Sequence, residues 1–263
     1  MFEWNRFVKV IKWSLSNMRR NIILVATALF AVFMIGDISR TMGKGVDFAL
    51  YDDGKAWVDI VSFVIFLWII FGGAWLFDNM KTKQGRITYL MLPASPLEKY
   101  LARYLIMTVG VLAVCLVAWI AADLVTMGLC VITFHETISF TKRLWIALFV
   151  YGWGHDSTAQ KYFVTSILWL GHAFYVLGGT FFRRHQLIFS IITSWILFML
   201  GLATGIWSLL SPDWSNIWEW EWTAKVWYSV AGTVLFCFAA LSYWLSYVIF
   251  RRMQVINNKW TNW

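Results

Sequence analysis

The feature of this sequence that most restricts its fold is a series of long stretches almost free of charged residues. A helix needs about 20 predominantly apolar residues to cross the hydrocarbon core of a bilayer. Six stretches of roughly that size lie at residues 21–35, 56–77, 104–132, 163–182, 186–210 and 226–250. The sequence therefore predicts an all-α membrane protein with six transmembrane helices in one membrane domain, residues 21–250.

The composition supports this fold class. Hydrophobic residues make up 60% of the 263 residues and charged residues only 14%, whereas soluble domains carry about 25% charged residues. Disordered proteins, disulfide-stapled secreted modules and nucleic-acid-binding domains are excluded, because none of them tolerates so many long apolar stretches. The net charge of +8 is instead typical of Lys and Arg held beside anionic lipid headgroups. We expect membrane lipid as a partner and no nucleic acid.

The distribution of charge predicts the orientation. Fifteen of the 22 Lys and Arg residues fall on one side of the six predicted spans, and eleven of the fourteen acidic residues fall on the other. Because Lys and Arg are enriched in cytoplasmic loops, the basic side is predicted to be cytoplasmic. Both termini then lie in the cytoplasm, with residues 251–263 as a cytoplasmic tail.

Residues 1–20 place large apolar side chains such as Phe7 and Trp13 among cations such as Arg6 and Lys9. This pattern is typical of an amphipathic helix that lies along the headgroup plane. The sequence predicts such an interfacial helix before the first span. It either orients that span or has a mechanical role.

The predicted cytoplasmic loop at residues 78–103 carries the clearest local signals. Ser95-Pro96-Leu97-Glu98 is a capping box with proline at the first helical position, so a helix begins there and continues into the third span. Before it, cations are followed by large apolar residues that lie outside any predicted span. Apolar surface at this place must be covered by lipid, by the protein itself or by a partner.

Two predicted outer segments, residues 135–157 and 207–225, are apolar or rich in tryptophan but too short to cross the membrane. Interfacial or re-entrant structure is expected for both, with anchoring to lipid favoured over ligand binding. Glycines predict close helix packing, either within the chain or against another copy. They are Gly72-Gly73, Gly178-Gly179 and the GxxxG pair Gly201 and Gly205.

Candidate chemistry is sparse. Asp59, Asp123 and His172 are a possible intramembrane polar site, since ionisable groups in spans are often functional. The two acids lie near span ends, and His172 is more typical of a hydrogen bond between helices than of a haem ligand. The segment from His135 to Ser139 lacks the second histidine of a zinc-protease motif, and no P-loop occurs. We expect no catalytic residue, metal or cofactor in this chain.

Taken together, these features resemble the permease subunits of type-2 ABC transporters, the exporter-like family with six spans per subunit. The architecture matches in its amphipathic first helix, the loop between the second and third spans and the outer element between the fifth and sixth. Local similarity is found in Gly85-Arg86, in residues 89–99 and in the run from Gly178 to Arg184.

The resemblance implies that the loop forms a coupling helix seated on a separate cytoplasmic ATP-binding subunit, which binds ATP and magnesium. A second permease subunit, identical or a sibling, would face this one in the bacterial cytoplasmic (inner) membrane. The implied contacts with the ATPase are Lys81, Lys83, Arg86, Tyr89 and Leu90.

The resulting hypothesis is a transport subunit without enzymatic activity of its own, in which ATP hydrolysis by the partner moves the loop and rocks the helices between inward- and outward-open arrangements. The apolar, tryptophan-rich outer half favours a lipid-like or amphipathic substrate, with export as the expected direction. The alternative is a non-transporting scaffold or assembly subunit of a membrane complex, which would use the same loop to hold a soluble protein. An intramembrane enzyme is disfavoured because no set of nucleophile, base and metal ligands is evident.

Overall fold

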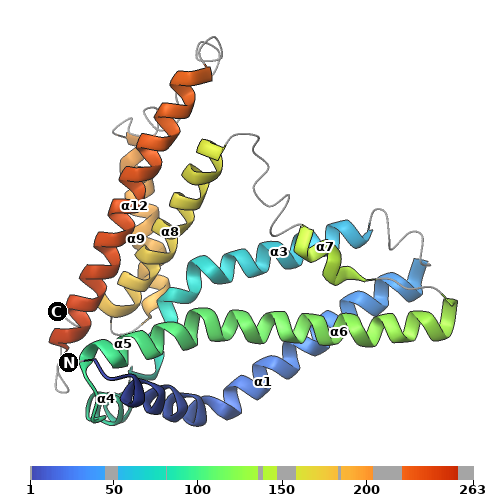
Figure 1. Ribbon diagram of the computed structural model, residues 1–263, viewed down its shortest axis with the longest axis horizontal. Coiled ribbons are helices and arrows are strands. Elements are labelled where there is room, and N and C mark those ends of the chain that lie inside the picture. Colours follow the sequence, from blue (N-terminus) through green and yellow to red (C-terminus); the bar gives the residue numbers. More distant parts are fainter. Residues whose placement is uncertain are drawn as a thin grey trace. The chain divides into compact units, whose positions relative to one another are not determined.

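The structure is a computed structural model, and it describes residues 2–44, 53–80, 82–135, 139–146, 158–182, 185–203 and 221–253. These residues are almost entirely helical, and no β-strand occurs among them (Figure 1). The α-helices are α1 (Trp4–Lys44), α3 (Asp53–Phe71), α4 (Lys83–Leu90), α5 (Pro96–Leu105), α6 (Val111–Phe134), α7 (Phe140–Ile146), α8 (Thr158–Phe181), α9 (Gln186–Ala203) and α12 (Glu221–Arg252).

Five helical stretches are long and apolar enough to cross a membrane, as in a multi-pass membrane protein. They are Trp4–Thr41, Trp57–Met80, Pro96–Phe134, Thr158–Phe181 and Lys225–Arg252. The predicted fifth span coincides with α9, whose apolar part Gln186–Leu200 is shorter, while residues 204–210 lie outside the described residues. The all-α class is thus confirmed, and the sixth span and the orientation stay predictions.

The N-terminal helix is longer than either predicted element, and the interfacial position of residues 1–20 stays a prediction. A single helix, α1, runs through 41 residues from Trp4 to Lys44 without an interruption between residues 20 and 21. It includes both the predicted interfacial helix and the first span, and it extends nine residues beyond the predicted end at Ile35. The reason is local, because α1 contains no proline and its first glycine is Gly36, so nothing interrupts the backbone hydrogen bonds near residue 20.

The predicted capping box is confirmed at the start of α5. The Ser95 hydroxyl accepts from the Glu98 amide at 3.3 Å, and the Ser95 amide donates to Glu98 Oε2 at 2.9 Å. Pro96 supplies the first helical residue. The helix continues through a π-helical turn, Ile106–Gly110, into α6, so the third span does begin in the loop, as predicted.

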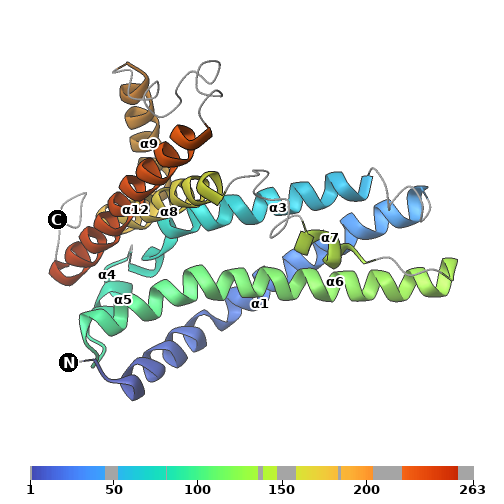
Figure 2. The same cartoon turned by 45° about the horizontal axis from the view of Figure 1, so that its top comes forward.

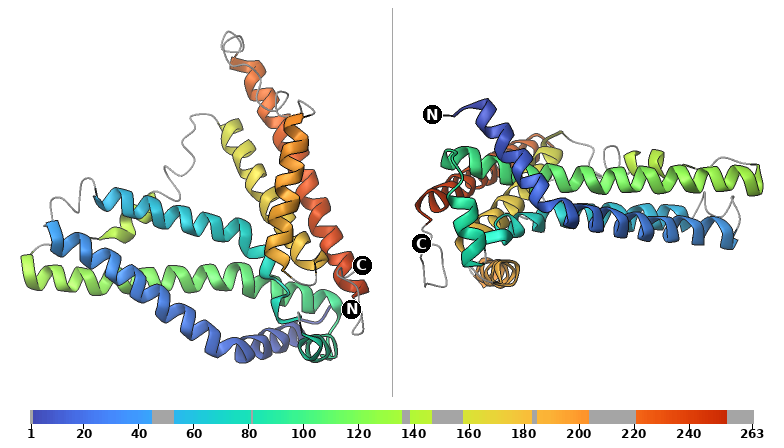
Figure 3. Two further views of the ribbon diagram at one scale, coloured as in Figure 1. Left: turned by 180° about the vertical axis from the view of Figure 1, so that it is seen from behind. Right: turned by 90° about the horizontal axis from the view of Figure 1, so that it is seen from below.

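The chain divides into two compact units. Unit 1 comprises Met1–Val10, Ile70–Met107 and His155–Trp263, and unit 2 comprises Ile11–Ile69 and Thr108–Gly154. In unit 1, α8 packs along α12, with α9 beside α8 (Figures 1 and 3). A short 3-10 helix, Gly72–Trp75, also packs against α8.

Unit 2 is built from α1, α3 and α6 with the short helix α7 (Figure 2). Its core surrounds Trp119 of α6, which is fully buried. The Trp119 ring meets Phe33 of α1 edge to face at 5.1 Å and Trp57 of α3 at 6.4 Å. One aromatic residue therefore joins the three long helices of the unit, as expected from the large apolar area that an indole buries.

The two predicted glycine pairs at residues 72–73 and 178–179 approach each other in unit 1. A Cβ atom at Gly179 would lie 2.7 Å from the Gly73 carbonyl oxygen and 2.8 Å from that of Ala74. Only a residue without a side chain permits this backbone contact. Of the GxxxG pair, Gly201 belongs to α9 and Gly205 lies outside the described residues, so its packing role stays a prediction.

We expect Gly179→Ala to destabilise the protein, because the added methyl group would push the 3-10 helix away from α8. Overpacking of this kind costs about 1–3 kcal/mol, which a lower midpoint of thermal unfolding in detergent would report. Gly128→Ala is the matched control, since a Cβ atom at Gly128 meets nothing within 4 Å. Equal midpoints for the two variants would contradict the packing argument.

Candidate functional site

The segment between the second and third spans, residues 78–103, is the candidate site and is called the basic loop below. It is folded, because α4 begins at Thr82, whose side chain accepts a hydrogen bond from the Gly85 amide at 3.1 Å. Gly85 then passes directly under the Asn79 carbonyl group, where a Cβ atom would overlap the oxygen. The glycine of the Gly85-Arg86 pair therefore lies in the first turn of α4, where the Asn79 carbonyl group leaves no room for a side chain.

Four of the five residues predicted to contact an ATPase belong to α4, and they separate into two groups. Arg86 and Tyr89 are only 2% and 1% exposed, so they face the interior of unit 1. Lys83 is exposed and Leu90 is half-buried, while Lys81 lies outside the described residues. The sequence could not separate the groups, because a helix of eight residues with mixed polarity has no clear apolar stripe.

The exposed face of α4 carries a different set of residues from the one predicted. Lys83, Ile87 and Met91 follow one another at intervals of four, which places them on one side of the helix. All three are exposed, Ile87 by 39% and Met91 by 73%. We call these three residues the outer stripe. It combines a cation with two apolar side chains.

The interior side of the basic loop is held by hydrogen bonds between α4 and α5. The Tyr89 hydroxyl donates to the Lys99 carbonyl oxygen at 2.6 Å, and the Lys99 ammonium donates to the Leu90 carbonyl oxygen at 2.7 Å. Burial raises the pKa of the Tyr89 phenol, so the hydroxyl remains a donor at physiological pH. Arg103 Nε adds a bond to the Leu76 carbonyl oxygen at 2.7 Å.

Glu98 connects the basic loop to the start of α1. Its side chain is fully buried and accepts hydrogen bonds from the Glu3 amide at 2.8 Å, from Arg6 Nη2 at 2.9 Å and from Arg6 Nε at 3.1 Å. The Ser95 amide also donates to it. A buried carboxylate is stable only when it is paired and hydrogen-bonded, and here the partners come from segments more than 90 residues apart.

Hydroxyl groups and rings connect α5 to the helices of unit 1. The Tyr100 and Ser246 hydroxyls lie 3.0 Å apart, and the Thr180 hydroxyl donates to Ser246 at 3.1 Å. Phe250 stacks on Phe77 with ring centroids 4.8 Å apart. The chain of contacts therefore runs from the basic loop to α12 and α8.

Asp123, one of the predicted intramembrane polar residues, accepts hydrogen bonds from the start of α7 in unit 2. Its Oδ1 accepts from the Phe140 amide at 2.9 Å, and its Oδ2 accepts from the Thr141 amide at 3.0 Å and the Ser139 hydroxyl at 2.9 Å. The Phe140 and Thr141 amides are the first backbone donors of α7, which a helix leaves without internal partners. Asp123 therefore caps α7.

The other two predicted polar residues have separate surroundings. Asp59 is exposed on α3 in unit 2. His172 is buried in unit 1, with its ring 5.8 Å from Tyr104 and 6.0 Å from Tyr243. Asp59 and Asp123 belong to unit 2 and His172 belongs to unit 1, so a site shared by the three residues stays a prediction.

Sequence reasoning missed Asp37, which it placed beyond the first span. Asp37 is 0% exposed in unit 2, and its Oδ1 accepts from the Trp57 indole at 2.8 Å. Within the described part of the chain its Oδ2 has no hydrogen-bond partner. The intervals of four between Phe33, Asp37 and Thr41 are the signal that could have revealed it, because they place the carboxylate on the buried face of α1.

Only parts of the two predicted outer segments, residues 135–157 and 207–225, belong to the described residues. Residues 139–146 form the start and body of α7, and residues 221–225 begin α12, whereas 136–138, 147–157 and 207–220 lie outside the described residues. Among the residues that are described, no three or more His, Cys, Asp or Glu side chains are grouped to hold a metal ion.

No known protein family, curated protein or solved structure matches this chain. The class that the helices define is therefore the multi-pass membrane protein. Its function must be argued from the basic loop itself.

We expect Glu98→Gln to destabilise the protein, because the amide loses charge and presents N–H donors to the Arg6 guanidinium. Loss of a buried charged partner of this kind costs roughly 1–3 kcal/mol. Glu3→Gln is the control, since the Glu3 carboxylate pairs with Arg6 only at the surface, at 3.6 Å, where such pairs contribute about 0–1 kcal/mol. The measurement is the midpoint of thermal unfolding in detergent. Equal decreases of the midpoint in the Glu98 and Glu3 variants would show that the buried Glu98 carboxylate does not stabilise the contact between the basic loop and α1.

Asp123→Asn should loosen α7, because an amide oxygen can accept at only one end and the amide nitrogen would face a backbone N–H. Hydrogen exchange followed by mass spectrometry would then show faster exchange at the amides of Phe140–Ile146. Asp59→Asn, an exposed change on α3, should leave that segment unchanged. Unaltered exchange in the Asp123 variant would disprove the capping role.

Proposed function

We propose that this chain is a membrane-spanning subunit of an ATP-driven transporter of the type-2 ABC kind, in which a separate subunit binds and hydrolyses ATP. The observation that carries the proposal is the construction of the basic loop. Its interior is fixed by buried hydrogen bonds, while its outer stripe stays exposed and carries both charge and apolar area.

The outer stripe supports docking of a protein on α4. Ile87 and Met91 expose apolar surface outside the candidate spans, and Lys83 adds a positive charge beside them. A partner with an apolar groove and an acidic rim matches this stripe. Because α4 is already folded, docking does not have to pay for ordering a flexible segment.

The contacts of the basic loop also support a mechanical role. Glu98 binds the first turns of α1, and Tyr100 reaches α12 through Ser246. Both α1 and the helix that begins at Pro96 continue along the chain as stretches that are long and apolar enough to cross a membrane. A displacement of α4 by an ATPase would thus reach several spans. The π-helical turn Ile106–Gly110 supplies a point of local irregularity where bending is easiest.

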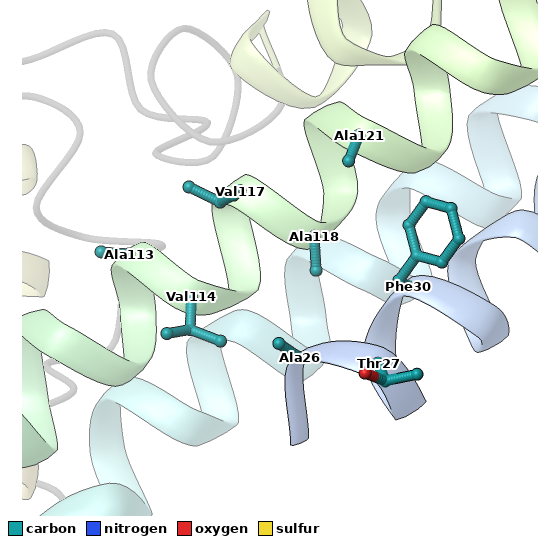
Figure 4. Close-up of a pocket in the computed structure, with 8 residues that line it drawn as sticks. All are labelled: Ala26, Thr27, Phe30, Ala113, Val114, Val117, Ala118 and Ala121. Atoms are coloured by element: carbon teal, nitrogen blue, oxygen red, sulfur yellow. The ribbon is translucent and has the colours of Figure 1, made fainter. Parts of the chain in front are cut away.

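The cargo that fits best is lipid-like or amphipathic. In unit 2 a groove of about 450 Å³ lies between α1 and α6, and all its lining residues are apolar except Thr27 (Figure 4). The Thr27 hydroxyl is satisfied by the Ile23 carbonyl oxygen at 2.9 Å. Such a lining offers nothing to a small ion. The proposal further includes a second permease subunit, export as the direction and the bacterial inner membrane as the location.

The test is purification from the native host in mild detergent, followed by identification of bound proteins and measurement of vanadate-sensitive ATP hydrolysis. A co-purifying ATPase whose rate depends on this chain is the expected result. A stable complex without nucleotide hydrolysis would instead support the scaffold alternative, and a chain recovered without any partner would reject both.

Within such a complex, we expect Lys83→Glu combined with Met91→Ser to reduce recovery of the ATPase severalfold, because both changes remove complementarity from the outer stripe. Arg86 and Tyr89 are unsuitable for this test, since they are buried and their loss would disturb the fold. Lys225→Glu, an exposed charge reversal at the opposite end of a span, is the matched control. Equal recovery from all three proteins would reject α4 as the docking site.

A further inference from the structure

A second feature of unit 1 is a pocket formed by the basic loop and the end of α12. It has a volume of about 380 Å³ and is lined by Leu90, Met91, Pro96, Lys99, Phe250, Arg251 and Met253. They lie at the end of α4, the start of α5 and the end of α12, with Met91 and Met253 directly after the last residues of α4 and α12. A volume of this size lies within the range of about 300–1,000 Å³ that is typical of small-ligand sites.

The charged part of the lining is entirely positive. The Lys99 ammonium uses one of its three N–H donors on the Leu90 carbonyl oxygen. Arg251 is exposed and makes no hydrogen bond with any residue in the described ranges. The neighbouring Glu98 carboxylate is ion-paired with Arg6 and accepts from the Ser95 and Glu3 amides, so its charge is already partly balanced before it acts on Lys99.

The rest of the lining is apolar, and the pocket lies at the end of a candidate membrane span. Leu90, Met91, Pro96, Phe250 and Met253 form this part. The candidate span in α12 ends at Arg252, directly beside the pocket. Phospholipid headgroups occupy that level of a bilayer, and anionic ones are attracted by clustered Lys and Arg.

We propose that this pocket binds the phosphate headgroup of an anionic phospholipid, with the phosphate between Lys99 and Arg251 and the glycerol and first acyl carbons against the apolar lining. Paired cations match a phosphate through charge-assisted hydrogen bonds. The ammonium group of phosphatidylcholine would find no carboxylate in the lining. A free phosphate ion would make no use of the five apolar side chains. The proposal does not rest on the transport function, although Met91 belongs both to the outer stripe and to the lining of this pocket.

The test uses the full chain, purified in detergent and stripped of lipid, with phosphatidylglycerol, phosphatidylcholine or inorganic phosphate added and binding followed by native mass spectrometry. We expect phosphatidylglycerol to bind, phosphatidylcholine to bind weakly and millimolar phosphate to leave the lipid bound. Displacement of the lipid by inorganic phosphate would overturn the lipid assignment in favour of a simple anion site.

The decisive variant is Arg251→Gln, which should weaken phosphatidylglycerol binding about tenfold, the loss of one charge-assisted contact. Arg252→Gln is the control, because it removes the same charge one residue away and Arg252 does not line the pocket. Arg251 is exposed, so the variant should fold, and an unchanged unfolding midpoint would verify this. Equal weakening by both substitutions, or by neither, would overturn the proposal.

A phosphatidylglycerol with a photoreactive group on its glycerol gives an independent readout of position. Cross-links should map to residues 90–96 and 250–253 and should decrease in the Arg251→Gln variant. Cross-links confined to other parts of α12 would show that the lipid only surrounds the helix, which would also overturn the pocket assignment.

Discussion

The interaction on which the basic loop depends is the buried carboxylate of Glu98. Transferring a carboxylate from water into a protein interior costs several kcal/mol unless hydrogen bonds replace its hydration. Here the capping box supplies one donor, and the Glu3 amide and the Arg6 guanidinium supply the others. The same oxygens therefore start α5 and hold the first turns of α1. Any movement of one helix that separates them would expose an unpaired charge.

This arrangement divides the basic loop into an inner and an outer part with different physical roles. The inner part satisfies buried polar groups, as with the Tyr89 hydroxyl and the Lys99 ammonium, and it keeps α4 and α5 in one position. The outer stripe makes no comparable demand on the fold and is free to contact something else. A preformed, exposed helix of this kind lowers the entropic cost of binding a partner, which is why we place the proposed ATPase contact there.

In unit 2 the buried carboxylates of the candidate spans bind within the unit and do not connect the basic loop to another helix. Asp123 is buried and serves to start α7, and Asp37 is buried against the Trp57 indole. Buried carboxylates are costly unless hydrogen bonds replace their hydration. For Asp123 the role of these bonds is structural. In contrast, the groove between α1 and α6 has almost no polar lining, so the described face of unit 2 between these helices suits acyl chains rather than ions.

The sequence by itself determined the features that depend on near neighbours. The apolar stretches predicted helices long enough for a membrane, and Ser95-Pro96-Leu97-Glu98 predicted the start of α5. The glycine pairs predicted close packing, although not that they pack against each other. Tertiary structure alone decided which residues of α4 face inward. The side of α4 that is buried is the side that packs against α5, where Lys99 and Arg103 lie, and the sequence of α4 does not show this. Tertiary structure also decided the partners of Glu98 and the cap formed by Asp123. Those contacts join residues that are 16 to 95 positions apart in the sequence. Contacts between residues so far apart are set by the packing of the helices and not by a local sequence pattern.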